Sequence, residues 1–146
     1  MFTIFNKNKS KNLKQKDNKQ KMIILRSDMI GDYIVCRNFF EAIKNSDRYK
    51  NYEITVIANE IYKDFLLHFD SKFIDKFIWV NTKLLNKRSY RKKLYKILKK
   101  ENYNIAINPI YARTGLYDDI MYNINAVEKI AFYGDTDYIS RLQLLQ

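Results

Sequence analysis

The chain has 146 residues, of which 47% are hydrophobic, and it carries a formal net charge of +11. This length and composition suffice to bury one core, which predicts one folded domain and excludes a disordered protein. The single Cys36 excludes an internal disulfide and is typical of a protein from a reducing cytoplasm. No segment approaches the roughly 20 apolar residues that a membrane-spanning helix needs.

Residues 1–21 carry more than half of the net charge, with seven lysines against Asp17 alone. They contain too few apolar residues to pack, so we expect a flexible, lysine-rich arm ahead of a domain over residues 22–146. An anionic membrane surface would attract each lysine by about 1 kcal/mol, yet a solvated arm is the simpler reading. The opening "MFTIF" is too short for the apolar core of a secretory signal.

Beyond the arm, strand-like and helix-like segments alternate along the chain. In chain order, the pattern predicts a strand at 22–26, a helix at 31–46, a strand at 52–59, a helix at 60–69, a strand at 76–80, a helix at 86–101, a strand at 103–109, a helix at 116–125 and a strand at 128–134. Such alternation favours right-handed crossovers and a Rossmann-like, doubly wound, mainly parallel sheet with helices on both faces.

Polar turn residues follow these predicted strands, where the loops of an open parallel sheet converge and bind ligands. They include Asp28, Asp32, Asn59, Asn81, Thr82, Asn108, Arg113 and Thr114, together with all three glycines. The chain lacks the glycine patterns of a dinucleotide fold or a phosphate loop. One histidine, His68, and one cysteine leave no set of residues for a zinc site.

The predicted helix at 86–101 is strongly basic, and its lysines and arginines could follow nucleic-acid phosphates while Tyr90 and Tyr95 stack on bases. A helix that covers a sheet needs a charged outer face in any case, so we favour a solvated surface. A non-enzymatic basic module that binds nucleic acid or an anionic membrane is therefore the alternative function. A receiver-like domain that binds Mg²⁺ through Asp28 and Asp32 is a further possibility.

The segment "MIILRSDMIGDYIV" joins the first strand of the domain to a helix through a turn that holds two carboxylates. Asp28, or Ser27 beside it, can accept hydrogen bonds from the first helical turn as an N-cap. Asp32 falls inside that turn, where free N–H groups and the helix dipole favour the ionised form that a general base needs. Spacing alone makes both carboxylates residues of a helix start.

The pattern R-x-D-x-I-G-D after an apolar strand resembles the opening of glycosyltransferase family 9, the heptosyltransferases of the lipopolysaccharide inner core. Later segments resemble the same family in order, namely "NYEITVIANEIYKDFL", "KFIDKFIWVN", "ENYNIAINPIYART" and "AVEKIAFYGD". The resemblance implies the N-terminal half of a two-domain GT-B enzyme. It also implies inverting sugar transfer without a metal or other cofactor.

The resemblance carries roles to particular residues. Asp32 matches the catalytic aspartate, and Gly31 leaves room for the acceptor sugar to approach the backbone. Arg113 matches a basic position and is expected to bind an acidic acceptor, with Thr114 as a hydroxyl contact or a helix cap. Arg26 is a second candidate for the acceptor, or else it holds the loop through Asp28 or Asp32.

Members of this family bind their donor, an ADP-heptose-like nucleotide sugar, in a second domain. This chain ends at "ISRLQLLQ", where the first domain would be nearly complete. We therefore expect a fragment, a truncated product or half of a split enzyme, inactive until a C-terminal domain completes it in cis or in trans. The implied partner is a lipid-linked or oligosaccharide acceptor at the cytoplasmic face of the inner membrane.

Overall fold

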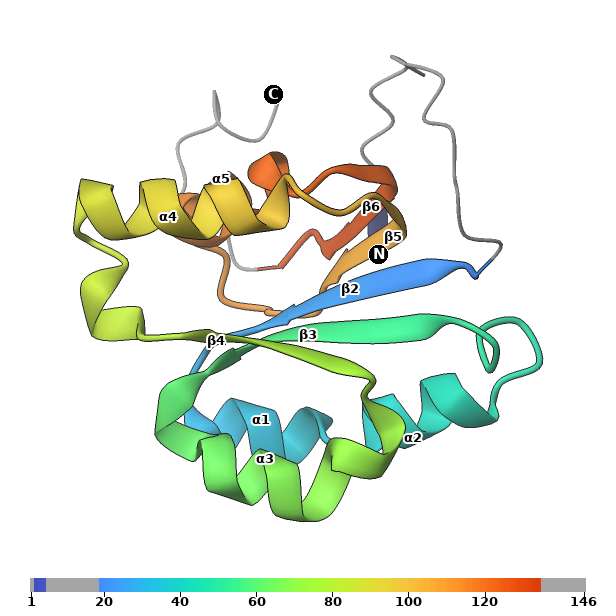
Figure 1. The fold of residues 1–146 in the computed structure, drawn as a ribbon. Coiled ribbons are helices and arrows are strands. Elements are labelled where there is room, and N and C mark those ends of the chain that lie inside the picture. Colours follow the sequence, from blue (N-terminus) through green and yellow to red (C-terminus); the bar gives the residue numbers. More distant parts are fainter. Residues whose placement is uncertain (1, 5–18, 135–146) are drawn as a thin grey trace.

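The computed structural model describes residues 2–4 and 19–134, which form one sheet with helices on both faces (Figure 1). Its strands are β1 (Phe2–Ile4), β2 (Lys21–Arg26), β3 (Glu53–Asn59), β4 (Lys76–Val80), β5 (Tyr103–Asn108) and β6 (Ala126–Phe132). They lie in the order β1-β6-β5-β2-β3-β4. All neighbours from β6 to β4 pair in parallel, while β1 pairs antiparallel with β6. The predicted Rossmann-like, mainly parallel sheet is confirmed.

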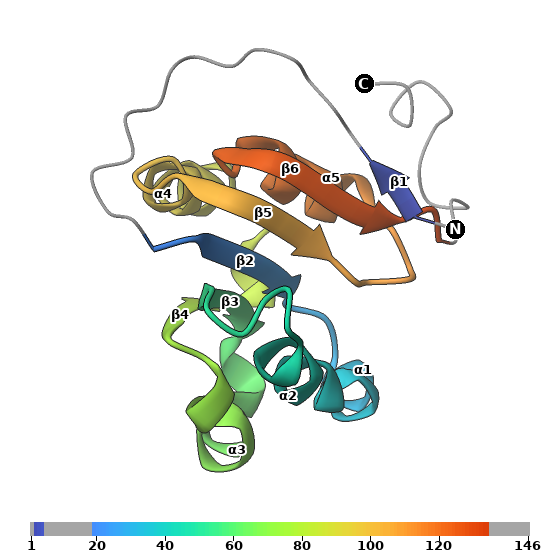
Figure 2. The ribbon, with the colours of Figure 1, turned by 90° about the vertical axis from the view of Figure 1, so that its right-hand side faces the viewer.

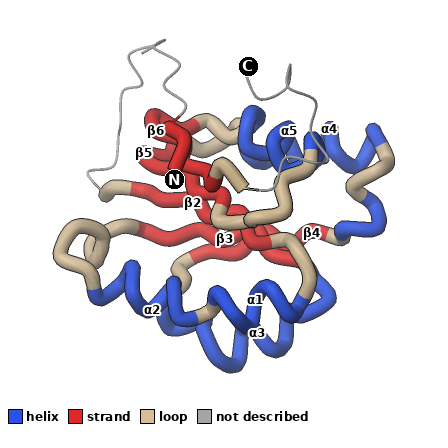
Figure 3. The backbone as a smooth tube through the Cα atoms, turned by 180° about the vertical axis from the view of Figure 1, so that it is seen from behind, coloured by secondary structure: helices blue, strands red, loops and turns tan. Residues whose placement is uncertain are grey.

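Two layers of helices enclose the sheet, as the view along it shows (Figure 2). The helices are α1 (Ile30–Cys36), α2 (Asn38–Asn45), α3 (Lys63–Asp70), α4 (Arg88–Leu98) and α5 (Gly115–Asn123), with short 3₁₀ turns η1 (Glu60–Tyr62), η2 (Ser71–Phe73) and η3 (Thr82–Leu84). Helices α1, α2 and α3 cover one face, and α4 and α5 cover the other (Figure 3). None of the described helices is long and apolar enough to cross a membrane.

The central strand β2 supplies side chains to both apolar layers. Ile23 and Leu25 pack on the α4–α5 side, and Met22 and Ile24 pack on the α1–α3 side. Successive residues of a strand point to opposite faces, so a strand buried on both faces must be apolar throughout. This burial is the physical reason for the continuous apolar run that identified the strand in the sequence.

Two details differ from the sequence prediction. The helix expected at 31–46 is divided at Arg37, whose φ of −58° and ψ of −35° keep the backbone helical while α1 ends and α2 begins. Strand β1 was not predicted, because three residues are too few to show a strand period. Residues 5–18 of the expected arm lie outside the described residues.

Candidate active site

The sheet has its topological switch point between β2 and β5. The chain runs from β2 to β3 and β4 in one direction and returns to β5 and β6 in the other. Ser27 and Asn108, at the carboxyl ends of these two strands, are both fully buried. Ser27 Oγ and Asn108 Nδ2 have no hydrogen-bond partner within the described part of the chain. Ligands of open α/β sheets bind at this kind of junction.

Arg26 holds the loop that follows β2. Its side chain is only 6% exposed, and one guanidinium nitrogen lies 3.2 Å from Asp28 Oδ2. Another guanidinium nitrogen donates a hydrogen bond to the main-chain carbonyl of Asp32. The Tyr62 hydroxyl donates to the Arg26 carbonyl and fixes the backbone from the other side. Of the two roles considered for Arg26, the geometry therefore favours holding the loop over contacting a substrate.

Asp28 does not cap the helix, so that part of the sequence prediction is wrong. Helix α1 begins at Ile30 after Met29, with no side-chain hydrogen bond at its start. The Asp28 carboxylate instead faces Arg26, because the buried guanidinium attracts it back toward the strand. Burial raises the pKa of Asp28 from 3.8 to about 6; Arg26 opposes this rise and the neighbouring charge of Asp32 adds to it.

Asp32 has the opposite environment. It lies in the first turn of α1, is exposed, and its carboxylate makes no hydrogen bond or ion pair with any residue that the structure describes. Gly31 beside it is also exposed, and a side chain added there would meet no atom within 4 Å. Asp32 is thus an accessible carboxylate on a backbone that Arg26 holds in place.

Arg113 and Thr114 make internal contacts after β5. Arg113 is 2% exposed, and its Nε and one terminal nitrogen donate to the Asp118 carboxylate at 3.2 and 2.8 Å. Thr114 is the N-cap of α5, and its hydroxyl accepts from the Tyr117 N–H at 3.4 Å. The capping role considered for Thr114 is present, while acceptor binding by either residue stays a prediction.

A group of residues that the sequence did not single out supports α1 from behind. Tyr33 stacks on Tyr62 with ring centroids 4.9 Å apart, and its hydroxyl donates to the buried Asp70 carboxylate. Arg37 lies 3.2 Å from the same carboxylate. These residues come from α1, the α1–α2 junction, η1 and α3, so no local pattern could have revealed the cluster. It locks the helix that carries Asp32 against its neighbour.

Other reactive side chains add little to this site. Cys36 is half-buried, and this burial raises its thiol pKa. His68 is exposed and packs edge-on against Phe69. Across residues 2–4 and 19–134, no three His, Cys, Asp or Glu side chains come close enough together to hold a metal ion. Asp28 and Asp32 thus lack a third acidic neighbour for the Mg²⁺ site considered above.

Comparison with known proteins gives one informative likeness. No protein-family model matches the chain, and no curated protein matches it. Among solved structures, the chain resembles the crystal structure of the glycosyl transferase family 9 from Veillonella parvula, with 18% sequence identity and a TM-score of 0.61. The match covers 77% of this chain and 31% of that chain, so the chain spans about a third of the glycosyltransferase. The described domain therefore has a glycosyltransferase-like α/β fold.

Proposed function

We propose that this domain binds the acceptor in an inverting, metal-independent sugar transfer, with Asp32 as the general base. The observation that carries the proposal is the contrast between two carboxylates on one turn. Asp28 forms an ion pair with the buried Arg26, whereas Asp32 is exposed and unpaired among the described residues. The R-x-D-x-I-G-D pattern and the fold likeness to a family 9 glycosyltransferase both support this reading.

In the proposed reaction, a hydroxyl oxygen of the acceptor forms a bond to the anomeric carbon of a nucleotide-activated sugar. The bond from that carbon to the nucleotide diphosphate breaks on the opposite face, so the configuration inverts. Asp32 takes the hydroxyl proton as the new bond forms. Arg26 contributes by binding the Asp32 main-chain carbonyl, which fixes the backbone that carries the carboxylate before the substrate arrives.

The finer assignments follow the family resemblance. We propose a heptosyltransferase-like activity in lipopolysaccharide or surface-glycan synthesis, with a lipid-linked or oligosaccharide acceptor at the cytoplasmic face of the inner membrane. An ADP-heptose-like donor would bind a second domain, present in cis or in trans. The domain found here corresponds to 31% of the similar glycosyltransferase chain, which leaves ample length there for such a domain.

The test is sugar transfer by this domain when a family 9 C-terminal domain completes it. Asp32→Asn should lower the transfer rate by roughly 10²–10⁴-fold, because it removes the base but not the side-chain volume. Acceptor binding, followed by NMR titration of the domain with an inner-core oligosaccharide, should persist. Asp64→Asn is the matched control, since Asp64 is also an exposed first-turn acid, in α3. Full activity of the Asp32→Asn enzyme would defeat the assignment.

A further inference from the structure

The segment from residue 82 to residue 100 concentrates positive charge without compensation. It holds nine lysine or arginine residues and no aspartate or glutamate. The exposed lysines along and just after α4 are Lys92, Lys93, Lys96, Lys99 and Lys100. None of these five pairs with a carboxylate or an aromatic ring in the part of the chain that the structure describes. We call these five residues the lysine face.

Most described lysines outside residues 82–100 contact a carboxylate or an aromatic ring. Lys44 lies 2.8 Å from Asp75, and Lys50 lies 2.9 Å from Asp47. Lys76 pairs with Glu53 at 3.0 Å. Lys63 and Lys72 sit over the rings of Trp79 and Phe73, respectively. The lack of partners on α4 is therefore a local feature and does not follow from the lysine-rich composition of the whole chain.

Solvation accounts for a charged outer face on α4, but it does not require like charges to follow one another without any acidic residue between them. Arg88, Lys92, Lys96 and Lys100 follow one another at four-residue spacing, where like charges repel. The helix has no side-chain cap and no acidic residue in its first turn, although both would stabilise its positive end. An anionic partner would relieve this repulsion, since no carboxylate among the described residues forms an ion pair with these lysines.

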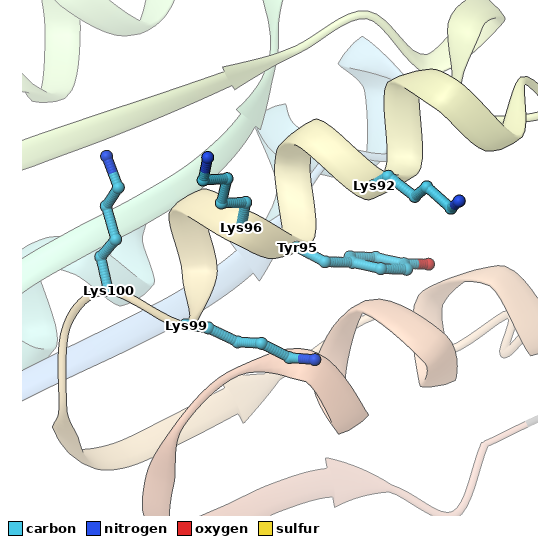
Figure 4. A pocket seen from close by; sticks show the side chains of 5 residues that line it. All are labelled: Lys92, Tyr95, Lys96, Lys99 and Lys100. Atoms are coloured by element: carbon cyan, nitrogen blue, oxygen red, sulfur yellow. The ribbon is translucent and has the colours of Figure 1, made fainter.

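The lysine face combines charge with apolar surface. Lys92, Tyr95, Lys96, Lys99 and Lys100 line an open hollow of about 400 Å³. The Tyr95 ring lies between the side chains of Lys92 and Lys99, while Lys96 and Lys100 extend away from it (Figure 4). A second hollow of about 310 Å³ adjoins the first, and Ile97, which is 49% exposed, and Lys100 line it beside strand β4. The ammonium groups of these lysines could contact a charged surface, while their methylene chains and Ile97 could contact an apolar layer just beneath it.

We infer that the lysine face docks this domain on an anionic lipid bilayer. Such a surface attracts juxtaposed basic side chains and accommodates an amphipathic helix that lies in its plane. Single-stranded nucleic acid fits less well, because it needs free aromatic rings for stacking. Here the rings of Tyr90 and Tyr95 are partly buried and pack against the apolar core beneath α4. Docking by α4 would leave α1, on the opposite face of the sheet, clear of the lipid (Figure 1).

Vesicle binding by the full chain tests this inference. The test variant replaces Lys92, Lys96, Lys99 and Lys100 by Gln. The matched control replaces Arg48, Lys50, Lys63 and Lys72 by Gln, which removes the same charge from the other side of the domain. On vesicles with equal parts of phosphatidylglycerol and phosphatidylcholine, co-sedimentation of the test variant should fall by about a hundredfold or more. Vesicle binding of the control should fall by less than about threefold. The N-terminal lysines are the same in both variants, so they do not affect the comparison.

Several results would overturn the inference. They are equal binding by the two variants, equal binding of the natural chain to pure phosphatidylcholine, or no vesicle binding at all. Tighter binding to a short DNA duplex than to anionic vesicles at the same salt concentration, lost with the same four lysines, would identify nucleic acid instead. Ile97→Gln separates the two partners further, because it should weaken binding to vesicles and leave binding to DNA unchanged. Circular dichroism and the unfolding temperature verify that each variant is folded.

Discussion

At the scale of single residues, two carboxylates on one turn differ because of one buried guanidinium. Arg26 contacts Asp28 through its side chain and Asp32 only through its main chain. Asp28 is therefore enclosed and paired, while the Asp32 carboxylate stays in solvent. A general base must be reachable by its substrate, so this difference in access separates the two residues more clearly than their positions in the sequence do.

The environment of Asp28 predicts a measurable titration. Its carboxyl should titrate at a pH near 6, compared with 3.8 for an unperturbed aspartate, as followed by carboxyl ¹³C chemical shifts. The folded pKa is the higher one, so the folded state binds the proton more tightly than the unfolded chain. The free energy of unfolding should accordingly fall as the pH rises from about 4 to about 6. Asp28→Asn removes this contribution, and an unchanged pH profile in that variant would contradict the prediction.

Replacing Arg26 should destabilise the fold. Arg26→Met leaves the buried Asp28 without its partner, and breaking such a pair costs about 3–5 kcal/mol in the free energy of unfolding. Adding Asp28→Asn should recover part of that loss, because no unpaired buried charge then remains. Urea denaturation of the two variants measures both effects. If Arg26→Met alone were as stable as the natural chain, the Arg26–Asp28 ion pair would not be what holds the loop.

At the scale of elements, two glycines that follow strands differ in whether their position could hold a larger side chain. Gly134 follows β6 with a φ of 60°, and a Cβ there would lie 2.3 Å from the Tyr111 carbonyl oxygen. Gly31 lies in the first turn of α1, and a Cβ there would meet no atom within 4 Å. The sequence placed both glycines on the same rim, but the two backbones differ. One glycine is required by close packing, and the other is compatible with a side chain.

Alanine substitution distinguishes these glycines. Gly134→Ala should lower the free energy of unfolding by more than about 1 kcal/mol, since it forces a side chain into a left-handed conformation against a carbonyl. Gly31→Ala should leave the free energy of unfolding unchanged or raise it by up to about 1 kcal/mol, because alanine favours a helix. Thermal unfolding measures both. If Gly31→Ala keeps its stability but loses sugar transfer in the completed enzyme, the space beside Asp32 is needed by the acceptor.

At the scale of the whole molecule, stability depends on a sheet buried from both sides. Ile24, in the central strand, is completely buried, whereas Ile34 on α1 is 48% exposed. Ile24→Ala should cost about 2–5 kcal/mol in the free energy of unfolding, because it opens a cavity between β2 and the helices below it. Ile34→Ala should change it by less than about 0.5 kcal/mol. Equal losses in chemical denaturation would mean that the outer face of α1 is also packed.

The sheet could be predicted from the sequence because its determinants are local. The runs "MIILR", "EITVIAN" and "YNIAIN" are apolar at successive residues, as strands buried on both faces must be. Helix α4 likewise follows from Leu94 and Leu98 recurring on one face. The position of Asp32 after the strand also followed from this pattern. Its role as a base came from the family resemblance and stays a proposal.

The sequence by itself determined the alternation of strands and helices from β2 to β6 and the rim on which polar residues gather. The tertiary structure decided which of those residues have partners. Asp28 is held by Arg26, Arg113 by Asp118, and Asp70 by Tyr33 and Arg37, while Asp32 and the lysine face stay open among the described residues. The physical reason is that the strand and helix periods are local properties of the chain. Burial and pairing of a charge depend on side chains that come from distant segments.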